Sequence, residues 1–324
     1  MKQWYKVIFL SLFFILFVTI FILLIWINNK VENDKLVDVS DNILSIFRHE
    51  MDLQKSNALF LSVALSEDKE LKVALLDDDE ESGYELLLNR LKKLKRYTFL
   101  KDIRTQLITS DLDIFARSWD NSYAGMPLDG LRADLHLIKK LREPKVSIDP
   151  GRLLSIKATT PIKDEDKIVG FIEAIKTFDE ITIILRKRDI ELSVLMYVDY
   201  LKVATLMREN PSFSSLVLSN RNYNQIVFND IKKIKPEIFE QENYTQNDKY
   251  LHIFEPMNDG NGKKIGFYVL SISKNKISKY DTSKDNISFF LNISKEDLYK
   301  IEKNRDTNNL NIMISDKPKV GNIR

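Results

Sequence analysis

One strand–turn–strand pattern occurs twice in this chain. The first copy is Thr160-Pro161-Ile162-Lys163-Asp164 followed by Val169-Gly170-Phe171. The second copy is Glu255-Pro256-Met257-Asn258-Asp259 followed by Ile265-Gly266-Phe267. Each copy reads as a strand, a polar turn and a return strand opened by glycine, and the two copies lie about 95 residues apart. The repeat predicts two domains of one type, each built on an antiparallel hairpin.

The N-terminal segment predicts a membrane helix. Val7 to Ile27 is 21 residues without a charge, and at a rise of about 1.5 Å per residue it matches a hydrocarbon core of roughly 30 Å. Lys2 and Lys6 precede this segment, which favours a cytoplasmic N-terminus. A cleavable signal peptide is the alternative, but it would end in a small-residue site, which Ile25-Trp26-Ile27-Asn28-Asn29 does not offer. We therefore expect an uncleaved anchor.

The rest of the chain holds no second apolar run of spanning length. We therefore expect a single membrane span, with everything after Asn28 on one side and outside the cytoplasm. The 49 basic and 47 acidic residues nearly cancel, so charge gives no indication of nucleic-acid binding. The absence of cysteine excludes disulfides and thiol chemistry.

The segment from Val31 to Leu65 contains few helix breakers and predicts one long helix that continues the anchor. Its apolar residues recur at spacings of three and four: Val39, Ile43, Ile46, Phe47, Met51 and Leu53. Two interpretations remain open. The helix either packs as a core helix on its own domain, or it also forms a stalk that pairs with a second copy in a homodimer.

The stretch from Arg104 to Ile175 predicts the first of the two domains, with an α+β fold. A five-strand sheet with helices over one face would bury its apolar strand residues together. The predicted elements are a strand at Ile103–Thr109, a short helix carrying Phe115, Arg117, Trp119 and Asp120, a turn at Tyr123–Pro127, a helix at Leu128–Leu141, and strands at Val146–Asp149, Arg152–Pro161 and Lys167–Lys176.

The second domain is predicted to follow the same plan in shorter form. Its expected elements before the hairpin are a strand at Glu191–Val198, a helix at Tyr200–Glu209 and a strand at Ser215–Ser219. From Ser273 the chain grows polar and rich in Asn and Lys, with one further helix expected at Lys295–Lys303. The crowd of charged residues that marks the first domain is absent from the second.

These charged and aromatic residues predict a ligand pocket in the first domain. A guanidinium fork suits a carboxylate, an indole face offers an apolar or cation-binding wall, and an aspartate can hold an ammonium group. Structural alternatives exist, because Arg117 could pair with Asp113 and Asp120 on a surface helix, Trp119 could be core, and Glu173 could face solvent. The candidate ligand-binding residues are Arg117, Trp119, Asp120, Tyr123, Arg132, Arg152 and Lys157.

Catalysis is not expected. His49, His136 and His252 are far apart and lack metal-ligand spacing, and no nucleophile elbow or phosphate-binding glycine motif occurs. The run Asp259-Gly260-Asn261-Gly262 lacks the spaced carboxylates of a calcium loop and predicts a hairpin turn. We therefore expect no enzyme activity, no metal and no cofactor.

The order of several short motifs resembles the membrane-distal module of double Cache sensors, which are extracytoplasmic domains of bacterial chemoreceptors and sensor histidine kinases. The matching motifs are Phe115-Ala116-Arg117-Ser118-Trp119-Asp120, Leu128, Leu131-Arg132, Gly151-Arg152-Leu153-Leu154-Ser155-Ile156-Lys157, Pro161-Ile162 and Gly170-Phe171-Ile172-Glu173. The resemblance covers about residues 31 to 273. It implies two PAS-like modules on a long N-terminal helix, with the small molecule in the distal one.

The same resemblance implies a localisation and a set of boundaries. The protein would lie in the cytoplasmic (inner) membrane with its C-terminal bulk in the periplasm. The segments would be a cytoplasmic N-terminus with anchor (1–28), a stalk helix (29–66), a membrane-distal Cache module (67–188), a membrane-proximal Cache module (189–290) and a polar tail (291–324).

The element Arg117-Ser118-Trp119 is similar to the Arg-x-Trp element with which amino-acid-binding Cache domains hold a ligand carboxylate. Those domains carry tyrosines around it, whereas Leu112 precedes it here and Asp120 follows. The expected ligand is therefore a small polar molecule, either an organic anion, an amino acid or an amine. Since such sensors normally return through the membrane to an output domain and this sequence shows no second span, we expect a separate kinase or chemoreceptor as signalling partner. The alternative is a non-signalling structural or binding tether of the cell envelope.

Overall fold

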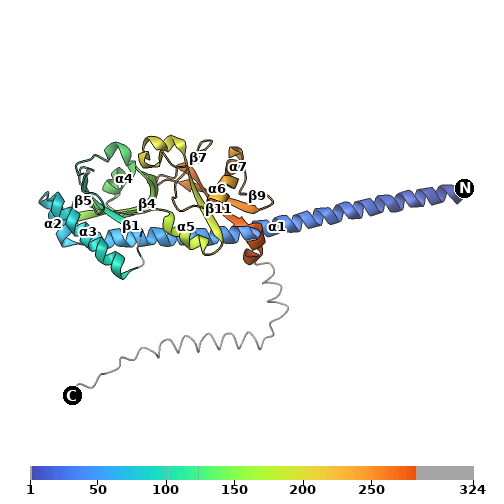
Figure 1. The fold of residues 1–324 in the computed structure, drawn as a ribbon, viewed down its shortest axis with the longest axis horizontal. Helices are drawn as coiled ribbons and strands as arrows, with labels where there is room; N and C mark the ends of the chain where they lie inside the picture. Colours follow the sequence, from blue (N-terminus) through green and yellow to red (C-terminus); the bar gives the residue numbers. More distant parts are fainter. Residues whose placement is uncertain (1, 99, 101, 123, 282–324) are drawn as a thin grey trace, which may run out of the picture. The chain divides into compact units, whose positions relative to one another are not determined.

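Two antiparallel sheets and one long N-terminal helix make up the fold (Figure 1). The computed structural model describes residues 2–281 except 99, 101 and 123. The predicted α+β class is confirmed by this arrangement. The described residues fall into two units, one from the chain up to Val39 and from Ser278 onward, the other from Ser40 to Ile277, and both sheets belong to the second unit. The helix predicted at Lys295–Lys303 and the polar tail lie outside the described residues.

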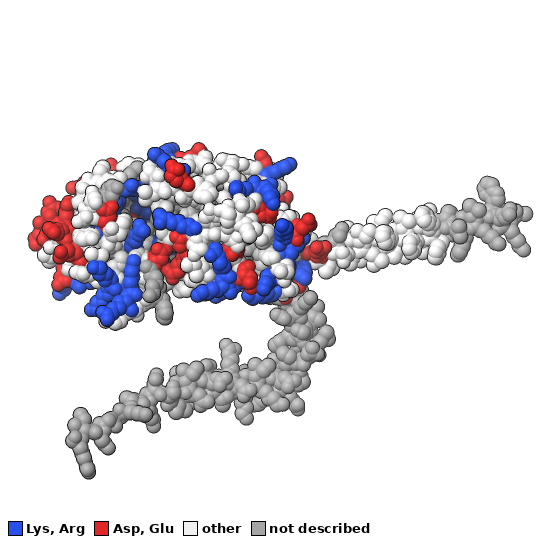
Figure 2. Space-filling model, in the orientation of Figure 1, with Lys and Arg blue, Asp and Glu red and all other residues white. Residues whose placement is uncertain are grey.

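The helix α1 (Lys2–Ser66) carries the predicted anchor. Within the described residues it is the one helix that is long and apolar enough to cross a membrane. Side chains 12 to 28 carry no charge and, where described, are exposed, so this part of the helix is white in Figure 2.

The C-terminal part of α1 is a core helix of the second unit. Ile43, Phe47 and Met51 are buried against their own chain, and the rings of Phe47 and Tyr268 lie 4.8 Å apart. Most of the apolar stripe seen in the sequence is therefore used within the chain. Leu53 and Phe60 remain 46% and 74% exposed. The homodimer through the stalk stays a prediction, and it would have to use this exposed face.

The first sheet has the strand order β2-β1-β5-β4-β3. Its strands are β1 (Ile103–Thr109), β2 (Ile114–Arg117), β3 (Lys145–Pro150), β4 (Leu154–Asp164) and β5 (Lys167–Lys176). The short helix predicted around Arg117 is wrong, because residues 114–117 form β2 and pair with β1. The positive φ of Leu112 closes a tight hairpin there, and a strand suits the Ile-Phe pair that follows.

Both faces of the first sheet are covered, which corrects the prediction of helices over one face. On one face α1 packs with α2 (Lys69–Leu76) and α3 (Glu80–Tyr97), using Leu61, Leu71 and Leu87 against β-strand residues such as Ile172. On the opposite, outer face lies α4 (Ala133–Leu141), whose Leu135 and Ile138 contact Phe171. Figure 1 shows α4 across the sheet from α3. The acidic turn between α2 and α3 is the red end of the unit in Figure 2.

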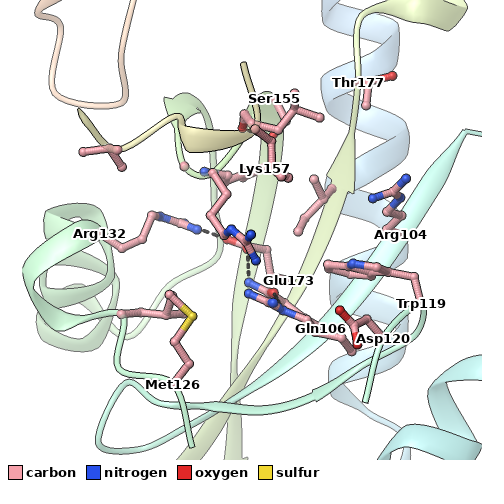
Figure 3. A pocket seen from close by; sticks show the side chains of 18 of the residues that line it. Arg104, Gln106, Trp119, Asp120, Met126, Arg132, Ser155, Lys157, Glu173 and Thr177 are labelled. Atoms are coloured by element: carbon pink, nitrogen blue, oxygen red, sulfur yellow. Dashed lines mark hydrogen bonds and ion pairs between the residues drawn. The ribbon is translucent and has the colours of Figure 1, made fainter. Parts of the chain in front are cut away.

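The helix predicted at Leu128–Leu141 is also shorter than expected. Residues Asp129–Leu131 form a 3-10 turn, η1, and α4 begins only at Ala133. Arg132 lies between the two with φ −135° and ψ 72°, so its backbone is not helical. This break matters for the site because it turns the Arg132 side chain toward the sheet (Figure 3).

The second sheet has the order β7-β8-β6-β11-β10-β9 and belongs to the same unit as the first. Its strands are β6 (Ile190–Tyr197), β7 (Ser212–Phe213), β8 (Leu216–Leu218), β9 (Tyr244–Gln246), β10 (Tyr250–Asn258) and β11 (Lys264–Ser273). The helices are α5 (Asp179–Arg186), which connects the two sheets, α6 (Gln225–Ile231) and α7 (Pro236–Gln241), and a 3-10 helix, η4 (Lys274–Tyr280), follows β11.

The helix predicted at Tyr200–Glu209 is wrong. Two 3-10 turns occupy the segment, η2 (Val198–Lys202) and η3 (Thr205–Met207). The β-branched Val203 and Thr205 lie where a continuous helix would have to pass, and such residues lower helix propensity. The predicted residue boundaries of the two modules stay predictions.

Candidate functional site

A cavity of about 280 Å³ opens on the outer face of the first sheet. Four strands, β1, β2, β4 and β5, supply its floor, and the segment after β2, the start of α4 and two loops of the second module supply its rim (Figure 3). Six of the predicted ligand-binding residues line it: Arg117, Trp119, Asp120, Arg132, Arg152 and Lys157. The seventh, Tyr123, lies outside the described residues. The structure thus brings the described candidates together, while their contact with a ligand stays a prediction.

The alternation of strand side chains explains why these residues meet. Gln106 on β1 is in register with Arg117 on β2 and with Glu173 on β5. Glu173 is in turn in register with Thr159 on β4, two residues from Lys157. Because every second residue of a strand points to the same face, these side chains all reach the outer face while Ile172 and Ala174 point toward α1.

The floor of the cavity is a buried hydrogen-bond network around Glu173. This carboxylate is 0% exposed. It accepts hydrogen bonds from Gln106 Nε2 at 2.6 Å and Thr159 Oγ1 at 2.9 Å, and Arg132 Nη2 lies 2.6 Å from its Oε1. A buried carboxylate is tolerated only when donors surround it in this way. Glu173 is therefore saturated by the protein itself, and the reading of it as a solvent-facing residue is wrong.

Arg132 is held by two carboxylates. Its Nε and Nη2 donate to the two oxygens of Asp134 at 2.8 and 2.7 Å, and Nη2 also contacts Glu173. Burial alone would lower the pKa of Arg132, but the two neighbouring carboxylates raise it well above its usual value. Burial likewise opposes ionisation of Asp134, yet Arg132 lowers its pKa. Arg132 thus acts first as the support of the cavity floor.

Lys157 is a buried amine at the side of the cavity. Its Nζ donates to the carbonyl oxygen of Asp149 at 3.2 Å, and the residue is 4% exposed. Burial, and next the charge of Arg132, lowers its pKa to about 8. A side chain could not be added at Gly151 without displacing this amine, since a Cβ there would lie 2.6 Å from Nζ. A nearby anion would raise this pKa again.

Trp119 lies at the rim between two guanidinium groups. The guanidinium carbons of Arg104 and Arg117 each lie 5.4 Å from the centre of its ring system. Trp119 is 36% exposed, so the reading of it as a core residue is wrong. Arg117 is 7% exposed and its Nε donates to Gln106 Oε1 at 3.2 Å, which excludes the surface-helix pair. Figure 3 shows Arg104 and Trp119 together on one side of the cavity.

Asp120 lies at the same rim. Its Oδ1 accepts from the backbone N–H of Ser122 at 2.9 Å and from the Ser122 hydroxyl at 2.7 Å. These hydrogen bonds lower the pKa of Asp120, and the positive charges of Arg117 and Arg152 add to the effect. Asp120 therefore stays ionised, and its Oδ1 is already engaged by Ser122 of the same turn.

Sequence reasoning missed several residues of the cavity. Gln106 and Glu173 could have been found, because each is a polar residue on the face of a strand whose other face is apolar. Arg104 follows the same alternation on β1. No sequence signal marks Leu206 or Arg221, which come from the second module and reach the cavity only through the packing of the two modules.

The lining of the cavity is rich in positive charge. Six of its described residues are basic, namely Arg104, Arg117, Arg132, Arg152, Lys157 and Arg221, and three are acidic, namely Asp102, Asp120 and Glu173. The acidic groups are already engaged, since Glu173 has three donors and Asp102 accepts from the Thr177 hydroxyl. The excess of bases favours an anionic ligand.

A Ser–His–Asp arrangement occurs in the second module but is not accessible to a substrate. His252 Nδ1 lies 2.8 Å from Ser271 Oγ, and Nε2 lies 3.1 Å from Asp230 Oδ2. His252 and Ser271 are 0% and 1% exposed and lie in paired strands. No group of three or more side chains suited to a metal ion occurs among the described residues.

No family model matches the sequence, and no curated protein matches it. Solved structures match in fold. The sensor domain of the Vibrio cholerae histidine kinase DctB has a TM-score of 0.46 at 14% identity, over 72% of this chain and 95% of that one. The periplasmic domain of Vibrio cholerae LuxQ has a TM-score of 0.39 at 13% identity, over 72% and 97%. The ligand-binding domain of the Pseudomonas fluorescens chemoreceptor CtaA, in complex with L-isoleucine, has a TM-score of 0.38 at 15% identity, over 78% and 97%.

These structures are thus a histidine kinase sensor domain, a periplasmic domain and a chemoreceptor ligand-binding domain. At these scores the similarity concerns the fold alone.

Proposed function

We propose that this protein is a membrane-anchored extracytoplasmic sensor that binds a small organic anion, a mono- or dicarboxylate, in the cavity of its first module. The observation that carries the proposal is the cavity itself. Its bases outnumber its acids, and its deepest acid, Glu173, is already satisfied by Gln106, Thr159 and Arg132. Keeping that many cations in one partly buried place is costly without an anion, so a bound carboxylate would be stabilised there.

The same geometry orders the ligand classes named from the sequence. An amine would need an available carboxylate, but Glu173 is enclosed by donors and Asp120 accepts two hydrogen bonds from Ser122. A carboxylate finds guanidinium groups and the Lys157 amine on several sides. We therefore place organic anions first, amino acids second and amines last. The apolar wall of Trp119, Met126 and Leu128 would contact the carbon skeleton of the ligand.

The anchor supports a place at the membrane. One described helix is long and apolar enough to span it, and we propose the inner membrane, with the two modules in the periplasm. The separate kinase or chemoreceptor partner stays a prediction. A structural tether remains the alternative, and it would bind no small molecule.

Thermal unfolding of the full chain in detergent tests the proposal. The panel is succinate, L-malate, butyrate, L-leucine and putrescine. A ligand that binds only the folded state stabilises it by about 2.7 kcal/mol at a concentration of 100 times its Kd. We expect a carboxylate to raise the melting temperature and putrescine to leave it unchanged. A panel without any carboxylate effect, or with an effect of putrescine alone, would contradict the proposal and favour the tether.

A further inference from the structure

We propose that the ligand site is shared between the two modules: Leu206 and Arg221 of the second module form its outer wall, and Arg221 binds the far carboxylate of a dianionic ligand. This inference rests on the proposed function, because it assigns further contacts to the same cavity. Both residues line the cavity, although they follow β5, the last strand of the first sheet, by about 30 and 45 residues.

Leu206 is fixed to the strand that carries Lys157. Its backbone N–H donates to the carbonyl oxygen of Arg152 at 3.1 Å. The next residue, Met207, contacts the same segment, since its Sδ accepts from the N–H of Leu154 at 3.4 Å. These two bonds attach η3 to the beginning of β4. Leu206 is nevertheless 53% exposed, and a ligand over the cavity would cover it.

The backbone of Arg221 is fixed beside the segment that follows β5. The backbone N–H groups of Arg221 and Asn222 both donate to Asp179 Oδ1 at 2.9 Å. The other oxygen of Asp179 lies 3.2 Å from the Thr177 hydroxyl oxygen, and Thr177 itself lines the cavity directly after β5. Arg186 holds the same turn through a 2.7 Å bond to Asn222 Oδ1.

The turn at Arg221 and Asn222 therefore fixes where the Arg221 side chain begins. Its backbone is bound from two sides, so the Arg221 Cα has a defined position relative to β5. The side chain borders the cavity and is exposed, and no carboxylate within the described residues forms an ion pair with it. A carboxylate bound on this side of the cavity would be a partner for its guanidinium group.

The shared site has a consequence for signalling. A dianion held at Arg117 by one end and at Arg221 by the other would join the first sheet to the second module. Its binding free energy would then depend on how the two modules are placed. A monoanion of the same length would bind the first module alone. The ligand class that produces a signal would thus be decided by its second carboxylate.

Succinate and butyrate make a matched pair of probes, because they have four carbons each and differ in the second carboxylate. Their affinities for the full chain in detergent are measured by calorimetry, for the parent and for Arg221→Ala, Arg221→Lys and Leu206→Ala. Arg208→Ala is the control, since Arg208 is an exposed arginine of the same module outside the cavity. We expect Arg221→Ala to weaken succinate binding about tenfold, the size of one charge-assisted hydrogen bond, with butyrate changed less than about twofold.

Arg221→Lys should restore part of the succinate affinity, Leu206→Ala should weaken both probes by a similar factor, and Arg208→Ala should leave both unchanged. The inference is overturned if the parent binds succinate and Arg221→Ala binds it equally well, which leaves the proposed function intact. It is also overturned if Arg221→Ala weakens both probes equally, since that indicates a structural role. A parent that binds no carboxylate removes the proposed function and the shared site together.

Discussion

The outer faces of the two sheets can be compared position by position, but the first encloses a cavity and the second is covered by a packed core. Lys157 of β4 has the same position in the repeated hairpin as His252 of β10 in the second copy. Glu173 of β5 likewise corresponds to Val269 of β11. In the second module Phe239 of α7 packs on this face, with its ring 4.7 Å from Phe254 and 5.6 Å from Phe267. In the first module the same area is left to the charged network and the cavity. One scaffold therefore gives a filled core in one copy and a cavity in the other.

The helices above the two faces explain the difference. The second module lays Phe228 and Phe239 of α6 and α7 directly over its sheet. The first module has the shorter apolar residues Leu135 and Ile138 on α4, and these reach only Phe171 and its neighbours. Arg132, before α4, reaches the sheet instead. A cavity forms where the covering helix supplies a cation in place of an aromatic ring.

The largest loss of stability is expected when Glu173 is replaced by valine, the residue at the equivalent position 269 of the second sheet. Glu173→Val removes the carboxylate that Arg132 contacts and leaves the Gln106 amide and the Thr159 hydroxyl without their acceptor. Removing one member of a buried ion pair costs about 3 to 5 kcal/mol, and Asp134 retains part of the pairing, so we expect a loss near the lower end. Chemical denaturation of the full chain measures it.

Glu255→Gln is the matched control, because Glu255 pairs with the exposed Arg48 on the surface of the second module. Its loss should be below about 1 kcal/mol. Equal losses in the two variants would show that the network under the cavity is no more important than a surface pair.

Burying the Lys157 amine beside the cavity should lower the stability of the folded protein. Its folded pKa of about 8 lies below its usual 10.5, so the folded state binds fewer protons than the unfolded state between these values. The charged form is therefore penalised by about 3 kcal/mol below pH 8, and the penalty disappears as the pH rises toward 10.5. We expect Lys157→Met to be more stable than the parent at pH 7, with the difference shrinking between pH 8 and 10.5. A difference that does not change over this window would contradict the prediction.

Arg117 tests the cavity as a binding site. Arg117→Met keeps most of the side-chain volume but removes the guanidinium beside Trp119 and Gln106. We expect the affinity for succinate to fall by about 1.5 to 3 kcal/mol, and the stability of the unliganded protein by about 1 kcal/mol. Arg48→Met is the control, and it should not change the affinity. If Arg117→Met binds succinate as the parent does, the ligand lies elsewhere.

The smallest effect belongs to the second face. Burial lowers the pKa of His252, although the hydrogen bond to Asp230 opposes the shift. Burial would raise the pKa of Asp230, but bonds from Asn247, Lys233 and His252 lower it to about 2. Stability supplied by neutral His252 is thus present above pH 6.5 and is lost as the pH falls below it. The slope of stability against pH between 5 and 6.5 should be smaller in His252→Gln, and an unchanged slope would contradict this.

The sequence predicted the hairpins best. Proline, a polar turn and glycine mark both of them, and β5 has the bounds that its pattern indicates. Prediction failed at Ile114–Arg117, where acidic and basic residues at helical spacing concealed a strand fixed by pairing with β1. It failed again at Tyr200–Glu209, where contacts with Arg152 and Leu154 hold short turns. Both failures lie where distant chain segments outweigh local propensity.

The site was predicted in part for a related reason. Arg117, Trp119, Arg132 and Lys157 stand out as charged or aromatic residues among apolar ones, so they could be singled out from the sequence. The contacts that these side chains make with one another could not be predicted from the sequence. The partners of Arg132 depend on the non-helical backbone at that residue and on the register of β1 with β5. Arg221 depends on a turn held by Asp179, and no local pattern encodes that contact.

The α1 helix is synthesised long before the segments that pack against it. It is made first, yet its contacts come late: Arg48 pairs with Glu255, 207 residues later, and Gln54 contacts Lys176, 122 residues later. At about 5 to 20 residues per second, the ribosome takes roughly 10 to 40 s to supply the second module. During that interval the side of the helix around Phe47 has no Tyr268 to cover it. We expect the growing chain to need a chaperone or the membrane surface for as long as that aromatic side stays bare.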